Sequence, residues 1–347
     1  MKSKVDGVLK KVIAEFALIK FESYRIALKL GKIQDIYCFE LINIEKLMVE
    51  LENKNIQIFE TINLYHLTDI IKNAIEKNDS LSIKKINEIA EIAATFTFKI
   101  FESTENVVKI CDFLLFFNIL SYHGLKSKFK SIFEIYANPV MQTINWLNLQ
   151  QFIKSKKRLL QAINEKPKLI QERSIQGFSL TQDEFIKQAG LEFIGVMHRL
   201  KYASRTWHDV ACSVCRVRPM VGMRFQCLKC FNYDTCQVCF LLQKVAGSHK
   251  MTHPQQEYCV RAGSKEKISS VARTIRNNVT KKYKQVVVSS EQASKSISDQ
   301  SSSEANSEVE KTLPDSPNTF LCNQINKLVL EENVKLKRIV ERFVSIF

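Results

Sequence analysis

The chain has 347 residues, an apolar share of 45% and a formal net charge of +15 at neutral pH. This length allows two or three domains, and the 22 phenylalanines indicate substantial buried cores. No signal peptide is visible, and the longest apolar run, Cys111 to Leu120, is far shorter than the ~18 residues of a membrane span. We therefore expect a cytosolic or nuclear protein, in which clustered cysteines bind metal rather than form disulfides.

Roughly the first 200 residues are predicted to be helical, because apolar residues recur there at helical spacing. One apolar stripe consists of Ile86, Ile89, Ala90, Ala93 and Phe96. A second stripe, through Phe21, Tyr24 and Leu28, predicts a helix that ends at Gly31. These patterns favour a mainly α fold for the first part of the chain.

Cysteines crowd together after this helical part, between residues 207 and 260. Their order is Cys212-x2-Cys215-x11-Cys227-x2-Cys230-x5-Cys236-x2-Cys239-x9-His249-x3-His253. A Cys-x2-Cys turn supplies two thiolates, and a structural zinc site takes four such ligands in a tetrahedron. Eight ligands therefore predict two Zn²⁺ ions.

Spacing alone leaves two ways to divide these ligands. A sequential pairing would group Cys212, Cys215, Cys227 and Cys230 on one ion. An interleaved pairing would group Cys212, Cys215, Cys236 and Cys239 on the first ion and Cys227, Cys230, His249 and His253 on the second. Both pairings give closed sites without a position for water, and no catalytic constellation is visible elsewhere, so we expect no enzyme.

Several other residues are expected to build the small fold around the metals. Gly222 is expected to allow a turn between the first two Cys-x2-Cys pairs. Four aromatic residues are expected to form its core: Phe225, Phe231, Tyr233 and Phe240.

Two runs within this region, Gly222-x-Arg224-Phe225-x-Cys227 and Phe231-Asn232-Tyr233-Asp234-x-Cys236-x2-Cys239-Phe240, resemble the ZZ-type zinc finger. The resemblance implies the interleaved, cross-braced pairing. It extends to Tyr24-Arg25-x-Ala27-x-Lys29-Leu30, to Met197-His198-Arg199-Leu200 and to the basic run from Ala272 to Asn278. With these runs the chain resembles the dystrophin and dystrobrevin family, its short dystrotelin-type members most of all.

The resemblance implies a mainly α fold with two EF-hand-like helical subdomains, a small α+β ZZ-type finger, a disordered linker and a C-terminal coiled-coil helix. The expected ranges are 10–130 and 131–205 for the helical subdomains, 207–260 for the finger, 264–285 for a basic helix, 286–318 for the linker and 320–347 for the coiled-coil or partner-binding helix. The best calcium-loop candidate starts at Glu102, but Val107 and Phe113 stand where a loop needs Gly and Glu. We therefore expect no Ca²⁺ binding.

The positive charge predicts an acidic partner. The family resemblance implies a scaffold at the inner face of the plasma membrane. Its tail helix would bind dystrobrevin- or syntrophin-like proteins, the chain would also contact a membrane receptor tail, and the basic helix would lie on anionic lipid. Nucleic acid is not expected, because the aromatic residues of the finger are better explained as its core.

The alternative function is a reader of protein N-termini, either histone tails or degradation signals. Such a reader needs acidic groups around the bound ammonium, because burying an unpaired charge is costly. Asp234 could serve, but Ser213 and Arg216 stand near the first cysteine pair, and Arg216 would repel an ammonium group.

Overall fold

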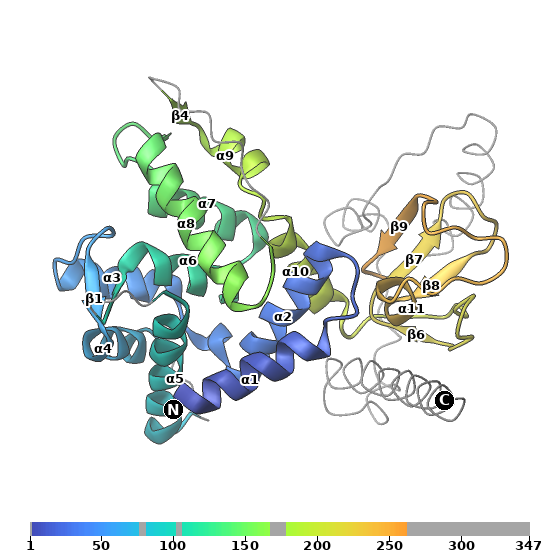
Figure 1. Cartoon of the computed structure of the whole chain (residues 1–347), viewed down its shortest axis with the longest axis horizontal. Helices are drawn as coiled ribbons and strands as arrows, with labels where there is room; N and C mark the ends of the chain where they lie inside the picture. Colours follow the sequence, from blue (N-terminus) through green and yellow to red (C-terminus); the bar gives the residue numbers. More distant parts are fainter. Residues whose placement is uncertain (1, 76–80, 102–105, 167–177, 262–347) are drawn as a thin grey trace, which may run out of the picture. The chain divides into compact units, whose positions relative to one another are not determined.

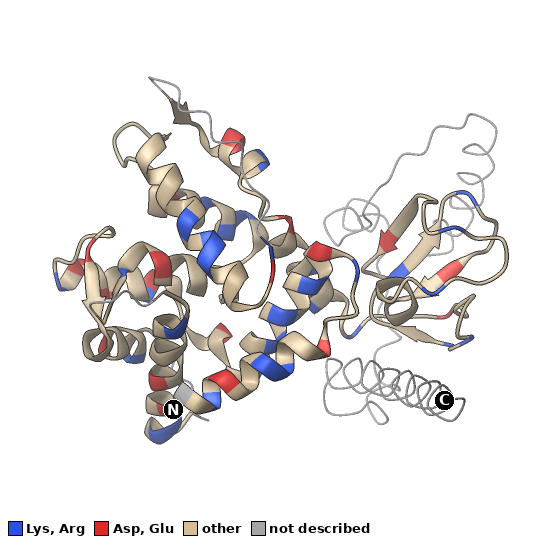
Figure 2. Cartoon of the chain, viewed as in Figure 1, with Lys and Arg blue, Asp and Glu red and all other residues tan. Residues whose placement is uncertain are grey.

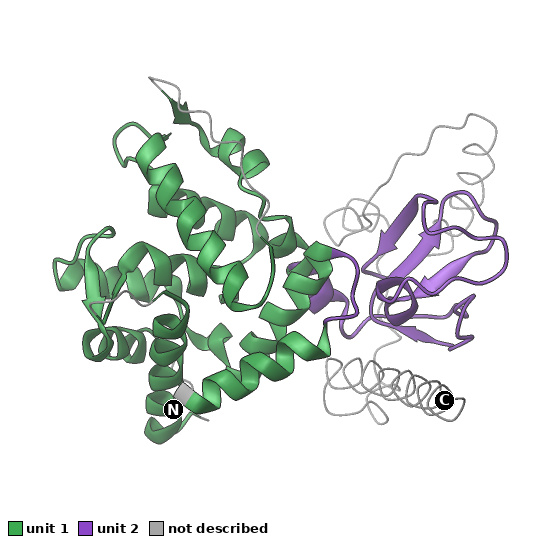
Figure 3. Ribbon diagram, in the orientation of Figure 1, with its two compact units in different colours: residues 1–16, 22–197 green, residues 17–21, 198–347 purple. Residues whose placement is uncertain are grey.

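The computed structural model describes residues 2–75, 81–101, 106–166 and 178–261. The chain divides into two compact units, the first formed by residues 1–16 and 22–197 and the second by residues 17–21 and 198–347 (Figure 3). The prediction of a mainly helical fold with small sheets near the finger is confirmed. The predicted basic helix, linker and C-terminal helix lie outside the described residues.

The first unit consists of helices and very short strands (Figure 1). In chain order these elements are α1 (Lys2–Glu15), α2 (Glu22–Tyr37), the 3₁₀ turn η1 (Phe39–Leu41), α3 (Ile44–Asn53), β1 (Thr61–Asn63), α4 (Leu64–Ala74), α5 (Ile83–Phe101), β2 (Val107–Lys109), α6 (Ile110–Leu120), α7 (Leu125–Tyr136), β3 (Ile144–Asn145), α8 (Trp146–Ala162), β4 (Ser179–Leu180) and α9 (Gln182–Gln188). Helix α10 (Glu192–Ala203) follows, with its residues up to Met197 in the first unit and those from His198 in the second.

The short strands join consecutive helix–strand–helix segments into pairs. Strand β1 pairs antiparallel with β2 through Ile62 opposite Val108, and β3 pairs with β4 through Ile144 opposite Leu180. Helices α4 and α8 begin directly after β1 and β3, where the Asn63 and Asn145 side chains accept a hydrogen bond from the first helical turn. The first ribbon thus connects two helix–strand–helix segments, α3–β1–α4 and α5–β2–α6.

Helix α6 forms the centre of the first unit. All of its residues are buried, including Asp112 and Asn118. It corresponds to the long apolar run of the sequence, and a helix that is apolar on every side belongs inside a folded core. The predicted stripe on α5 packs here too, where Phe96 stacks on Phe116 with ring centroids 5.8 Å apart.

One buried ionic group ties α2 to the end of α8. The Glu165 carboxylate, 1% exposed, accepts hydrogen bonds from Arg25 at 2.6 Å and 2.7 Å and from Lys29 at 2.6 Å. Lys29 also donates to the Ile163 carbonyl at 2.8 Å. Burial alone would raise the pKa of Glu165, but these hydrogen bonds outweigh it and the pKa is lowered.

The predicted end of the second helix at Gly31 is wrong. Helix α2 continues through Gly31 to Tyr37, and Leu30 and Ile33 on either side of the glycine are fully buried. Burial of these neighbours outweighs the ~1 kcal/mol that glycine costs inside a helix. Phe21, which the same stripe included, lies before α2 and belongs to the second unit.

The second unit contains the cysteine-rich region, built from short strands around one helical turn. Its elements are β5 (Trp207–His208), β6 (Met220–Val221), β7 (Arg224–Cys227), β8 (Asp234–Cys236), α11 (Gln237–Leu241) and β9 (Gln255–Tyr258). Strand β7 is the central strand between β8 and β9, and β5 pairs with β6. The predicted turn at Gly222 is confirmed, since this residue has a φ of +89° and an added Cβ would lie 2.7 Å from the Gln237 side chain.

Lysine and arginine residues are spread over both units rather than gathered on one element (Figure 2). Among the described residues, no helix combines the length and apolarity needed to cross a bilayer.

Candidate metal centre

The strands of the second unit bring distant cysteines together. Cys227 ends β7, while Cys236 ends β8 and stands at the start of α11, which carries Cys239. Because β7 and β8 pair antiparallel, with Arg224 opposite Cys236, their cysteines lie at opposite ends of the ribbon. The geometry therefore separates the second and third Cys-x2-Cys pairs into different groups.

The first group consists of Cys212, Cys215, Cys236 and Cys239, whose sulfur atoms all lie within 4.8 Å of one another. The Cys215 and Cys236 sulfurs are 3.7 Å apart. The Cys236 backbone N–H donates to the Cys212 sulfur at 3.4 Å, which favours negative charge on that sulfur.

The second group consists of Cys227, Cys230, His249 and His253, whose ligand atoms also lie within 4.8 Å of one another. His253 Nδ1 is 3.3 Å from the Cys230 sulfur and 3.8 Å from the Cys227 sulfur. The Cys227 sulfur accepts backbone N–H groups from Lys229 at 3.3 Å and Cys230 at 3.1 Å, as expected in a tight turn.

Both groups have the spacing of a tetrahedral zinc site. With Zn–S bonds of about 2.3 Å and Zn–N bonds of about 2.0 Å, sulfurs lie roughly 3.8 Å apart and sulfur and nitrogen roughly 3.5 Å apart. Both ring nitrogens of His249 are buried and have no hydrogen-bond partner among the residues that the structure describes. A buried imidazole of this kind needs a proton donor or a metal ion, so the donor set fits zinc.

Charge within the first group also favours a cation. Hydrogen bonds from Cys236 and Cys239 lower the pKa of Cys212, so that one thiolate is stabilised. The hydrogen bond with Cys212 in turn raises the pKa of Cys236 to about 12. Four thiolates cannot share this small volume unless a metal ion balances their charge.

Aromatic rings support the metal groups. Tyr233 stacks on His249 with ring centroids 4.0 Å apart, and Phe225 stacks on Phe240 at 3.6 Å. Phe225 and Tyr233 are buried, as the sequence predicts for the finger core. The prediction for Phe231 is wrong, because its side chain is 59% exposed next to the Cys227–Cys230 turn.

Strands β7 and β8 also carry an ion pair that the sequence did not reveal. Arg224 Nε donates to Asp234 Oδ1 at 2.8 Å, and both side chains are buried. The Arg224 guanidinium lies 4.7 Å from the centre of the Tyr258 ring. Asp234, the acidic residue considered for binding an ammonium group, is thus paired inside the finger, and Arg216 is exposed with a φ of +64°.

The structure describes the calcium-loop candidate of the sequence only in part. Its first residue, Glu102, lies outside the described residues, Val107 begins β2, and Phe113 is fully buried in α6. Asn106, one position before Val107, has a positive φ of +55°.

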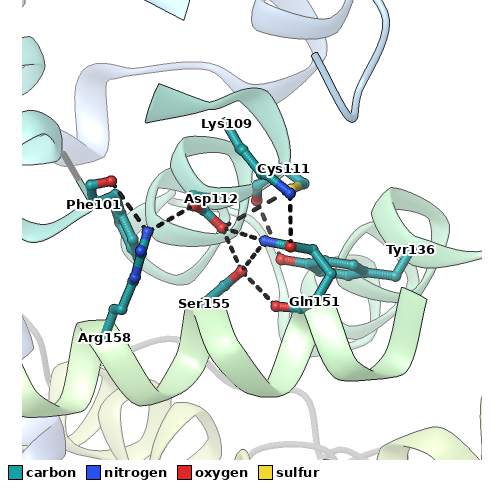
Figure 4. A network of polar contacts seen from close by, with 8 residues as sticks. All are labelled: Phe101, Lys109, Cys111, Asp112, Tyr136, Gln151, Ser155 and Arg158. Atoms are coloured by element: carbon teal, nitrogen blue, oxygen red, sulfur yellow. Dashed lines mark hydrogen bonds and ion pairs between the residues drawn. The ribbon is translucent and has the colours of Figure 1, made fainter. Parts of the chain in front are cut away.

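Figure 4 shows the polar cluster around the Asp112 carboxylate, which is 1% exposed. Asp112 accepts hydrogen bonds from Ser155 and, at 3.1 Å, from Gln151. Arg158 lies 3.9 Å from the second carboxylate oxygen and donates to the Phe101 carbonyl at 3.2 Å. Burial raises the pKa of Asp112, although Ser155 and Arg158 both act against this change.

Two family models match the chain. The model described as "Zinc finger, ZZ type" matches residues 206–251, and the model described as "EF hand" matches residues 7–121. The first match includes the six cysteines and His249, whereas His253 follows its end.

Curated proteins match over a longer stretch. Dystrophin-1 of Caenorhabditis elegans is 26% identical over 300 residues, which cover 77% of this chain and 8% of that protein. Dystrophin isoform B of Drosophila melanogaster is 25% identical over 303 residues, or 79% of this chain and 18% of that protein. Human dystrotelin is 39% identical over 89 residues, or 26% of this chain and 15% of that protein.

The chain thus spans less than a fifth of the length of each of these relatives. The matches confirm the resemblance predicted from the sequence: the chain is similar to dystrophins and to dystrotelin, and it contains regions that match the EF-hand and ZZ-type zinc-finger models.

Proposed function

We propose that this chain is a non-enzymatic scaffold whose finger holds two Zn²⁺ ions. One ion is held by Cys212, Cys215, Cys236 and Cys239, and the other by Cys227, Cys230, His249 and His253. The observation that carries the proposal is the gathering of these eight donors into two groups of four. Each group supplies all the ligands of a structural zinc site, so no position is left for a water molecule or substrate.

Zinc would supply a fixed, positively charged crosslink between segments that are too short to fold alone. The protein residues position the ligands. The three-stranded sheet positions Cys227 and Cys236, and the Tyr233 ring orients His249 by stacking on it. Metal affinity of about 10–16 kcal/mol then stabilises the folded finger and is not used to promote a reaction.

The proposed domain ranges are those expected from the sequence, 10–130 and 131–205 for EF-hand-like parts and 207–260 for the finger. Support comes from the two antiparallel ribbons, β1 with β2 and β3 with β4, one in each helical part.

We also propose that the helical region binds no calcium. The Asp112 carboxylate already has Ser155, Gln151 and the Arg158 guanidinium around it, and Arg158 also donates to the Phe101 carbonyl at the end of α5. A guanidinium here supplies positive charge that a calcium ion would supply in a competent loop. Lys109, whose ammonium donates to Gln151 at 3.0 Å, adds a second positive charge nearby.

The proposed partners follow from the family resemblance. The segment 320–347 would bind dystrobrevin- or syntrophin-like proteins as a coiled-coil or partner-binding helix, and the basic segment 264–285 would contact anionic lipid at the inner face of the plasma membrane. A membrane receptor tail is the third proposed partner.

The alternative, reading of protein N-termini by the finger, receives less support. An ammonium group needs exposed carboxylates. Asp234 is buried and paired with Arg224, whereas the exposed residue after Cys215 is the positively charged Arg216.

The test is capture of interacting proteins with three forms of the chain: the intact chain, a deletion of 320–347, and a Cys227→Ser/Cys230→Ser variant. The scaffold proposal expects dystrobrevin- or syntrophin-like proteins with the intact chain and their loss on tail deletion. Capture of free N-terminal peptides that depends on the finger and survives the deletion would instead establish the reader. A zinc content below two ions per intact chain would contradict the proposed metal sites.

A further inference from the structure

A short segment far from the finger in sequence belongs to the finger's compact unit. Residues 17–21 connect α1 to α2, yet they group with residues 198–347 rather than with the helices on either side (Figure 3). The EF-hand family match, residues 7–121, includes them, whereas the ZZ-type match begins only at residue 206, so neither match assigns them to the finger. Their place in this unit is therefore a feature of this fold that the family match leaves unassigned.

The contact between this segment and the finger is a stack of three aromatic rings. Phe21 lies on Phe240 with ring centroids 4.6 Å apart and an interplanar angle of 7°. Phe240 lies on Phe225 at 3.6 Å, again with an angle of 7°. Phe240 is thus held between two nearly parallel rings, one from residues 17–21 and one from β7.

The central ring of this stack is directly linked to the first metal group. Phe240 follows Cys239, and both lie on α11, a helix of five residues that starts after Cys236. A helix this short is not stable by itself in water, so its position depends on side-chain contacts. Fixing Phe240 on both faces therefore fixes the backbone that carries Cys239.

We propose that Phe21 is a positioning residue of the finger, which holds α11 in place through Phe240 and so slows zinc release from the Cys212–Cys215–Cys236–Cys239 site. The proposal rests on the two zinc sites proposed above. Zinc leaves a site of this kind after a ligand detaches, and Cys239 cannot swing away while Phe240 stays between its two neighbours. The group Cys227–Cys230–His249–His253 has no ligand on α11, so its zinc release is independent of Phe21.

The experiment uses the full chain loaded with zinc and follows metal transfer to an excess of the chromophoric chelator 4-(2-pyridylazo)resorcinol. The variants are Phe21→Ala, Phe21→Leu and Phe21→Trp, with Leu18→Ala as the matched control in the same segment, where Leu18 is 41% exposed. An aromatic contact of this type corresponds to about a three- to tenfold change in rate. Cadmium-113 NMR of the loaded chain identifies the faster site by its ligands, four sulfurs or two sulfurs and two nitrogens.

Phe21→Ala and Phe21→Leu are expected to release the ion of the four-sulfur site about three- to tenfold faster, and Phe21→Trp and Leu18→Ala to match the unchanged chain. Unchanged release from Phe21→Ala, equal acceleration at both sites, or full restoration by leucine would each overturn the proposal. If Phe21→Ala does not fold by circular dichroism, the Leu and Trp pair decides the question, because leucine keeps apolar volume without a ring. Fewer than two zinc ions in the unchanged chain would instead refute the metal sites themselves.

Discussion

Arg224 and Asp234 form a buried ion pair across neighbouring strands, with 2.8 Å between the Arg224 Nε and Asp234 Oδ1 atoms. Burial raises the pKa of Asp234, and the nearby Arg224 charge only partly offsets this effect. The pair therefore matters to the stability of the finger mainly because removing one partner would leave the other charge buried without a counter-charge. It also removes an acidic group from the finger surface.

Replacement of Arg224 by methionine is expected to lower the unfolding free energy of the finger by about 3 kcal/mol, because it leaves the Asp234 carboxylate buried without its partner. Asp234→Asn keeps a hydrogen-bond acceptor but leaves the buried Arg224 guanidinium without its counter-charge, so it is expected to cost about 3 kcal/mol as well. Denaturant unfolding followed by Trp207 fluorescence, in a Trp146→Phe background, would report on the finger alone.

Arg218→Met is the matched control for this prediction. Arg218 pairs with Asp209 at 2.9 Å, but its side chain is 61% exposed, so the expected cost is about 0–1 kcal/mol. Equal effects of the Arg224 and Arg218 substitutions would contradict the assigned importance of the buried pair.

The two ways of pairing the zinc ligands make opposite predictions for one variant. In the cross-braced arrangement, Cys236→Ser/Cys239→Ser destroys the four-sulfur site and leaves one ion with two sulfurs and two nitrogens. In the sequential arrangement the same change destroys the mixed site and leaves four sulfurs. We expect about one zinc ion per chain, with mixed coordination by zinc X-ray absorption spectroscopy.

Cys259→Ala provides the control for metal content, since Cys259 is buried in the same unit but belongs to neither group. It is expected to retain two zinc ions. An ion with four sulfur ligands in the double variant would refute the cross-braced pairing.

The sequence predicted the chemistry of the finger better than the contacts around it. Ligand types and spacing are local, so the eight candidate ligands could be read from the chain, whereas their division depends on how β7 pairs with β8. Phe21 followed helical spacing with Tyr24 and Leu28, and nothing local separated it from α2. Its contact with Phe240 in the folded chain is what places Phe21 with the finger and not with α2.

Helical spacing correctly predicted the buried stripe through Ile86, Ile89 and Ala90 on α5, although all residues from 92 to 98 of this helix are buried as well. It failed at Gly31, where tertiary packing outweighed the local preference of glycine to end a helix. The Arg224–Asp234 and Glu165 ion pairs could not be predicted either, because they join residues whose proximity is set by strand register or by packing between helices.

Glu165 should make the stability of the helical unit depend on pH. Its lowered pKa means that its contribution is complete above the usual Glu pKa of about 4.3 and is lost as the pH falls through the lower folded value. Glu165→Gln, which leaves Lys29 buried without a counter-charge, is expected to cost about 3 kcal/mol at pH 7.

The difference between this variant and the unchanged chain should narrow progressively below pH ~4, as the carboxylate of the unchanged chain takes up a proton. Trp146 fluorescence in a Trp207→Phe background would follow unfolding of the helical unit. Glu134→Gln, at a half-exposed carboxylate paired with Lys130, should change stability little at any pH. A constant difference from pH 7 to pH 3 would show that the ion pairs with Arg25 and Lys29 do not determine the effect.

Arg158 is expected to stabilise the helical unit in the way that a bound cation would. Arg158→Gln removes the positive charge near Asp112 and the hydrogen bond to the Phe101 carbonyl, at an expected cost of about 1–2 kcal/mol, whereas substitution of its exposed neighbour Lys157 by Gln should cost almost nothing. Thermal unfolding with and without millimolar calcium would measure both changes, and equilibrium dialysis would measure bound calcium directly.

Because Arg158 and Lys109 already place positive charge around the Asp112 cluster, calcium should neither raise the melting temperature of the unchanged chain nor bind to it. Saturable calcium binding to the unchanged chain would show that these side chains do not take the place of an ion.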